Sequence, residues 1–181
     1  MVLAFLAVVV LSGVFLIGMY NSLVQLRVRS ESAWSDIDVQ LKRRHDLIPN
    51  LVETVKGYAT HEKDTFENIA KFRSMAMQAT GPVDKAAAEN QLTGALKSLF
   101  AVAENYPQLQ ASQEFTQLQN SLSEIEDAIQ NARRYYNAVV RDLNTKIQSF
   151  PTNILAETFG FQQKQFFEAA AADREPVAVK L

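Results

Sequence analysis

An uncharged apolar run at the start of the chain is the feature that most limits its fold. Residues 2–19 are apolar except for Ser12, and the first charged side chain is that of Arg27. About 20 apolar residues in an α-helix cross the hydrocarbon core of a bilayer, where every backbone polar group must bond within the helix. The run therefore predicts a single transmembrane anchor over residues 1–22. A cleaved signal peptide is the alternative, which we disfavour because no Lys or Arg precedes the run and residues 16–20 make a poor cleavage site.

The residues that follow the run predict the orientation of the anchor. Tyr20 stands where an aromatic residue at a membrane interface is expected, and the basic residues Arg27 and Arg29 come next. Because basic flanks are retained on the cytoplasmic side, we expect the rest of the chain in the cytoplasm. Two arginines are a small bias, so the periplasmic or extracellular side is the alternative.

The composition beyond the anchor predicts one all-helical domain. Roughly 160 residues remain, which suits one domain with its own core. The whole chain holds only six Gly and five Pro, and Ala, Leu, Gln, Glu and Lys, all good helix formers, are abundant. We therefore expect a helical bundle over residues 23–168 and a flexible C-terminal tail over residues 169–181.

Breaks in the sequence divide this bundle into about four long helices. No Gly or Pro lies between Tyr20 and Ile48, so the anchor should continue as one helix to Pro49. Because proline lacks an N–H, Pro49 should bend or end this helix, and we expect a kink. A second helix around residues 66–77 should stop at Gly81-Pro82, a third around residues 86–103 before Pro107, and a fourth, over residues 108–149, at Pro151. The predicted fold class is all-α, with an N-terminal transmembrane helix continuing into an antiparallel up-and-down bundle.

The fourth of these segments carries a heptad seam. Its apolar side chains alternate by three and four positions, as at the contact line of packed helices. The seam consists of Phe115, Leu118, Leu122, Ile125, Ile129, Ala132, Tyr136, Val139 and Leu143. An intramolecular core is the favoured interpretation, because three other amphipathic helices are available; a coiled coil with another subunit is the alternative.

The residue inventory disfavours an enzyme. There is no cysteine, and His45 and His61 are the only histidines, with no Glu three residues before either, so thiol chemistry, hydrolase triads and a di-iron site are not expected. We predict no catalytic residue, no cofactor and no metal ion, and we interpret His45 as a hydrogen-bonded histidine of the core or its boundary. The formal net charge of −2 gives nucleic acid little to bind.

A series of short motifs resembles the bacterial LemA family across nearly the whole chain. The motifs are residues 20–21, 34–52 and 55–58, then Tyr106-Pro107-x-Leu109-x-Ala111-Ser112, Arg133-Arg134-x-Tyr136-Asn137-x-x-Val140-x-x-Asn144 and Phe150-Pro151-x-Asn153. Each motif is weak alone, but the whole series in the family's order is specific. The resemblance implies a single-pass protein of the bacterial inner membrane, a bundle of long helices and no established enzymatic activity.

Two groups of residues form candidate interaction surfaces. Lys42, Arg43 and Arg44 are consecutive cations that one helical face cannot all neutralise, although a solvated face is the simpler interpretation. The other group is the aromatic set Phe159, Phe161, Phe166 and Phe167. These rings either cap the open end of the bundle, which we favour, or form an exposed patch that docks on another subunit or protein.

Three functional hypotheses follow, of which an enzyme or cofactor carrier is the least favoured. The first is a non-enzymatic scaffold, anchored in the lipid bilayer, that forms a homo-oligomer. The second is a monomeric adaptor that binds another membrane or envelope protein, such as a protease or a stress component. The size of the protein in detergent distinguishes the first two.

Overall fold

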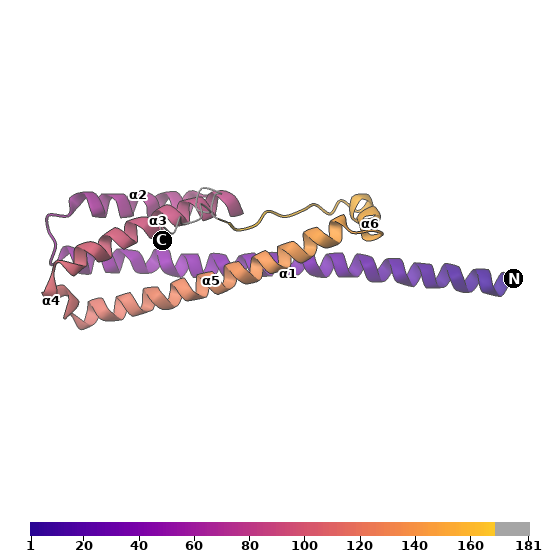
Figure 1. Ribbon diagram of the computed structural model, residues 1–181, viewed down its shortest axis with the longest axis horizontal. Helices are drawn as coiled ribbons and strands as arrows, with labels where there is room; N and C mark the ends of the chain where they lie inside the picture. The colour runs from indigo at the N-terminus through magenta and orange to yellow at the C-terminus, as the bar shows by residue number, and fades with distance from the viewer. Residues whose placement is uncertain (169–181) are drawn as a thin grey trace, which may run out of the picture. The chain divides into compact units, whose positions relative to one another are not determined.

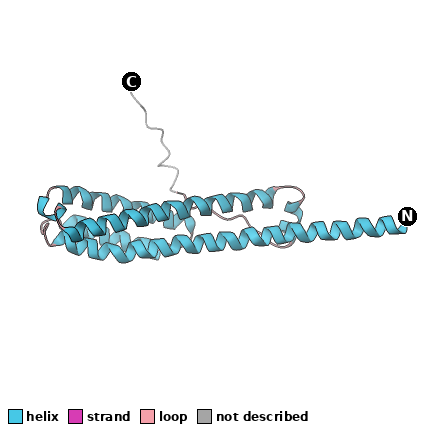
Figure 2. Cartoon of the chain, turned by 90° about the horizontal axis from the view of Figure 1, so that it is seen from below, coloured by secondary structure: helices cyan, strands magenta, loops and turns pink. Residues whose placement is uncertain are grey.

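The computed structural model describes residues 1–168, which contain helices and no strand (Figure 2). The predicted all-α fold is confirmed. The described residues form α1 (Val2–Lys56), α2 (Lys63–Gln78), α3 (Pro82–Glu104), α4 (Pro107–Gln110), α5 (Gln113–Gln148) and α6 (Thr152–Thr158). The four long helices are those expected from the sequence, and α4 and α6 are short additions. The tail predicted for residues 169–181 lies outside the described residues.

Glycine and proline set the boundaries of the helices, as the sequence predicts. Gly81 precedes α3 with a φ of +78°, a conformation that glycine adopts without steric cost, and Pro82 follows as the first helical residue. Pro107 begins α4 in the same way. Pro151 separates α5 from α6. These connections are short, so consecutive long helices return antiparallel to one another.

Of the two outcomes expected at Pro49, an end of the helix does not occur, because α1 continues to Lys56; the kink stays a prediction. A proline inside a helix leaves the carbonyl four residues earlier without its N–H partner, and here that carbonyl belongs to His45. The Arg73 side chain of α2 replaces the partner, its Nε donating to the His45 carbonyl oxygen at 2.8 Å. A tertiary hydrogen bond thus supports the helix at the position where the local sequence weakens it.

The described residues fall into two compact units: Met1–Asp36 with Ala132–Gln165, and Ile37–Asn131 with residues 166–168. We call them the anchor unit and the bundle unit. In the bundle unit, α2 and α3 lie side by side (Figure 1). Its core is apolar and draws on every helix of the unit, including Ile48, Leu51, Val55, Ile69, Leu92, Leu99, Leu109, Phe115 and Leu122. The predicted division into residues 1–22 and 23–168 stays a prediction.

In the anchor unit, α1 supplies the apolar run and α6 follows the end of α5 (Figure 1). The run contains an 18-residue stretch long and apolar enough to cross a membrane, and 0% of it is buried. A core helix of a soluble protein would be buried, so this exposure fits a single-pass membrane protein. The small core of this unit lies just beyond the run, where Leu23 packs with Leu143, Ala156 and Phe161.

The heptad seam lies on the buried face of α5. Phe115, Leu122, Ile125 and Ile129 in the bundle unit, and Tyr136, Val139 and Leu143 in the anchor unit, are each less than 9% exposed. Leu118 and Ala132 are partly buried. The seam therefore packs within its own chain, as the favoured interpretation requires.

Candidate functional site

The bundle unit contains a buried ionic cluster centred on Arg44. This side chain is 2% exposed and comes from α1, on the same face as Leu41 and Ile48. Its NH1 donates to Oε2 of Glu89 at 2.9 Å, and its NH2 donates to Thr93 Oγ1 at 2.7 Å and to Glu126 Oε1 at 2.9 Å. Arg44 thus joins α1 to α3 and α5.

His45 completes the cluster from the next position of α1. Its Nε2 lies 2.8 Å from the second carboxylate oxygen of Glu89, and the ring is 6% exposed. The interpretation of His45 as a hydrogen-bonded core histidine is confirmed. Since Glu89 bonds both residues, one buried carboxylate holds α1 and α3 in register. The Nε of Arg44 is the one buried side-chain donor without a partner within residues 1–168.

The predicted cationic surface must be corrected at Arg44. Lys42 and Arg43 are exposed, and they contact Asp46 and Gln40 of the same helix. The Lys42 hydrogen bond lowers the pKa of Asp46 below its usual value. Arg44, in contrast, points into the bundle unit, because successive side chains on a helix diverge by about 100° and only two of three neighbours can share the outer face. A binding role of Lys42 and Arg43 stays a prediction.

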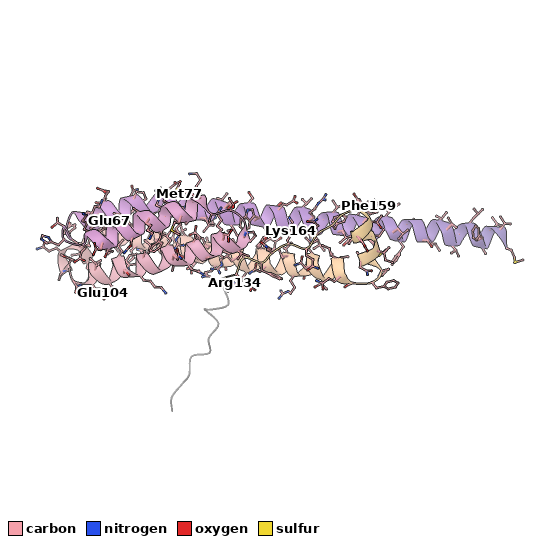
Figure 3. All side chains as sticks on the ribbon, turned by 90° about the horizontal axis from the view of Figure 1, so that it is seen from above. Glu67, Met77, Glu104, Arg134, Phe159 and Lys164 are labelled. Carbon is pink, nitrogen blue, oxygen red and sulfur yellow. The ribbon has the colours of Figure 1, made fainter. Side chains whose placement is uncertain are left out.

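The anchor unit contains an aromatic cluster at the end of the apolar run. The Tyr20 ring lies 4.9 Å from Phe159 and 5.9 Å from Phe161, measured between ring centroids. The Arg27 guanidinium stands 5.2 Å from the centre of the Phe161 ring. Phe161 is buried, whereas Phe159, labelled in Figure 3, is 56% exposed. The cluster ties α6 and the following residues to the part of α1 that comes directly after the apolar run.

Two side chains of α5 fix the extended segment after α6. The Asn144 amide pairs with the Lys164 backbone in both directions, donating to its carbonyl at 2.8 Å and accepting from its N–H at 2.9 Å. The Tyr136 hydroxyl donates to the Gln165 carbonyl at 2.9 Å, and burial raises the pKa of this phenol above 10.0. Side chains of α5 therefore hold this segment through hydrogen bonds to its backbone.

The four phenylalanines do not form one exposed patch. Phe161 and Phe167 are buried, at 9% and 1% exposure, and Phe166 is partly buried. Only Phe159 of this set presents most of its ring to solvent. This burial leaves Phe159 as the candidate contact, and the capping role of the other rings stays a prediction.

No pattern in the sequence led us to Glu89, Glu126 or Thr93. Glu89 could have been noticed, because it continues the apolar stripe of Leu92, Leu96 and Leu99 by one helical turn. An acidic residue on an apolar stripe indicates a buried partner of opposite charge. No local pattern identifies Arg44 as that partner, because Arg44 and Glu89 are 45 residues apart in the sequence.

Comparisons with known proteins agree with the fold and with the motifs. The LemA family model matches residues 33–181. Magnetosome protein MamQ 2 of Paramagnetospirillum magneticum is 28% identical over 98% of this chain and 74% of its own length. Protein LemA of Metamycoplasma hominis is 29% identical over 89% of this chain and 74% of its own. Neither name indicates an enzymatic activity, and together with the apolar helix they support a membrane-associated protein of unestablished activity. The match over most of the chain shows that the protein belongs to the LemA family.

Proposed function

We propose that this protein is a non-enzymatic helical scaffold that is anchored in the bacterial inner membrane and self-associates there, with its bundle unit in the cytoplasm. The observation that carries the proposal is a contrast in exposure. The apolar stretch of α1 is 0% buried, whereas the apolar stripes of α3 and α5 are buried within the chain. The first surface requires lipid, and the second builds a stable body on the anchor.

The buried polar groups support a structural role. Arg44, His45 and Glu89 bond to one another, so their charges and donors are used to hold helices in register. Within residues 1–168 no group of three metal-binding side chains gathers. Because these side chains bond to one another, they stabilise the fold and do not present a reactive group to a substrate.

Exposed apolar side chains near the α2–α3 turn support self-association. Met75, Met77 and Val83 are 42%, 56% and 46% exposed, and Figure 3 labels Met77 on the surface. Met75 and Met77 are two positions apart on α2, about 200° around the helix, so they offer apolar contacts on two of its sides, and methionine adapts its shape to a partner. We assign the contact between copies to this region.

Sizing of the full chain in mild detergent, by light scattering and native mass spectrometry, tests the proposal. We expect an oligomer that Met75→Glu with Met77→Glu converts to a monomer. The matched control is Ser74→Glu with Gln78→Glu, which adds the same charge at exposed positions of the same helix and should leave the oligomer intact. A monomeric wild-type chain that co-purifies with one membrane protein would favour the adaptor instead, and a monomer without any partner would refute both.

A further inference from the structure

The chain turns back beside α1 at residues 150–159, which we call the apex segment. Before this segment, Tyr136 of α5 packs against Trp34, with 5.4 Å between the ring centroids. After it, the Lys164 ammonium pairs with Glu31 at 3.3 Å. Both contacts belong to the anchor unit, and between them the chain approaches the apolar run and returns (Figure 1).

Two contacts fix the level of the apex segment along α1. The Thr152 hydroxyl lies 3.6 Å from the sulfur of Met19, the last residue of the apolar run. The Phe159 ring lies 4.9 Å from the Tyr20 ring, measured between centroids. Residues 14–18 of α1 are exposed, whereas Met19 and Tyr20 are partly buried. The protein thus begins to cover α1 where the run ends, and the apex segment lies at that level.

The end of the run coincides with the edge of the hydrocarbon core. At 1.5 Å per residue, residues 2–19 span about 27 Å, close to the roughly 30 Å of the core, and the interfacial layer beyond it is about 5–7 Å thick. The Met19 side chain tilts toward the N-terminus of α1, and so toward the membrane, as side chains on a helix do. Phe150 and Ile154 stand two positions from Thr152, so their Cα atoms lie within about 7 Å of its Cα. Both residues therefore reach the interfacial layer.

The apex segment exposes large apolar side chains at this depth. Phe150 is 82% exposed, more than Phe5 at 70% and Phe15 at 60%, which belong to the run itself. Ile154 and Phe159 are 57% and 56% exposed. Apolar groups that are exposed in one short segment mark a contact surface. At the end of a membrane span the nearest apolar phase is the bilayer, whose interface takes apolar side chains to a depth of about 5–10 Å.

We propose that Phe150, Ile154 and Phe159 insert into the interfacial layer of the bilayer that α1 crosses. The apex segment then forms a second membrane contact beside the transmembrane helix. This inference rests on the membrane anchor of the proposed function and goes beyond it, because a scaffold does not require a second contact. Interfacial side chains set the tilt and rotation of a membrane helix, so the apex segment fixes which side of the anchor unit faces its neighbours.

Quenching of a single indole by brominated lipids tests the insertion. Trp34→Phe removes the only tryptophan of the chain, and Phe150→Trp then places one indole in the apex segment. The full chain is reconstituted in vesicles of phosphatidylcholine, with or without bromine on the sixth and seventh acyl carbons. We expect the bromine to lower the emission about twofold, because interfacial groups penetrate to the start of the acyl chains. Since Phe150 is exposed, the variant should keep the helical circular dichroism of the wild type.

The matched control is Tyr135→Trp in the same background. Tyr135 is an aromatic residue of the same unit at 54% exposure, and its neighbour Tyr136 contacts Trp34. Trp34 lies about 22 Å beyond Met19 along α1, so an indole at position 135 should keep its emission in brominated vesicles. Phe15→Trp, within the run, is the positive control and should be quenched about twofold.

The outcomes distinguish this inference from the proposed function. Quenching at position 15 but not at position 150 would overturn the insertion and leave the anchor in place. If neither position is quenched, the chain does not span the bilayer and both proposals fail. Equal quenching at positions 135 and 150 would also overturn the insertion, because the whole anchor unit would then lie against lipid. If neither brominated lipid nor acrylamide quenches the indole at position 150, another protein copy covers the apex segment and the lipid assignment is wrong.

Discussion

The substitution Glu89→Leu tests whether the buried cluster holds the bundle unit together. Glu89 is 5% exposed, and its two oxygens accept from Arg44 NH1 and His45 Nε2 at 2.9 and 2.8 Å. Leucine replaces the carboxylate with an apolar side chain and removes both acceptors. Arg44 would then stay buried with Thr93 and Glu126 as its remaining partners.

The expected cost follows from this geometry. Removing one partner of a buried ion pair costs about 3–5 kcal/mol, since the remaining charge is desolvated without compensation. Glu126 is 33% exposed, so water screens its attraction and it replaces Glu89 only in part. Against a typical stability of about 5–15 kcal/mol, the loss is large. For a domain of this size it lowers the melting temperature by roughly 6–20 °C.

A double variant tests whether the loss of stability comes from the buried charge of Arg44 or only from the loss of contacts. Arg44→Met with Glu89→Leu removes both charges, leaving mainly the unpaired His45 donor at about 1–3 kcal/mol. The double variant should therefore be more stable than Glu89→Leu alone. Lys42→Met is the control, because the ion pair between Lys42 and Asp46 is exposed and contributes only about 0–1 kcal/mol to the stability.

The assay is thermal unfolding of the full chain in detergent, followed by circular dichroism at 222 nm. If the double variant melts at or below the temperature of Glu89→Leu, the charge of Arg44 is not the source of the cost and the reasoning is wrong. If Glu89→Leu melts like the wild type, the cluster does not stabilise the bundle unit at all.

Three further predictions concern single side chains. Ile125→Asp should cost several kcal/mol, because this position is 6% exposed, whereas exposed Gln130→Asp should not; equal melting temperatures would place the seam on the wrong face. Phe167→Ala should cost about 3–5 kcal/mol, since the ring is 1% exposed, and Phe166→Ala less; an unchanged melting temperature for Phe167→Ala would contradict its burial. Because burial raises its pKa in the folded state, Tyr136 stabilises the fold below pH 10.0 and loses this contribution as the pH rises through the raised value. One of the five tyrosines should thus ionise late at 295 nm, and Tyr136→Phe should abolish that phase.

Most of the fold was predictable because its causes are local. Gly81-Pro82, Pro107 and Pro151 end helices through their own backbone chemistry, whatever surrounds them. The seam of α5 was visible because residues three and four apart share one face of any helix. The apolar run predicts a membrane span for the same reason, since crossing a bilayer depends on length and hydrophobicity alone.

The candidate sites were predictable only where one segment contains the whole site. Tyr20 was expected at the interface from its position after the apolar run, but its contacts with Phe159 and Phe161 depend on the return of the chain after α6. Arg44 was assigned to the surface because its sequence neighbours are cations. Its burial depends on Glu89, which no pattern within α1 indicates.

By itself, the sequence determined most of the helix boundaries, the face that α5 buries and that the first helix is long and apolar enough to span a membrane. The tertiary structure decided how those faces meet: it buried Arg44 against Glu89 and gave the His45 carbonyl a new partner in Arg73. The physical reason is the range of the forces. Backbone propensity and helical periodicity act over a few residues, whereas an ion pair or a groove requires side chains that are distant in sequence and that only the packed helices bring within a few ångströms.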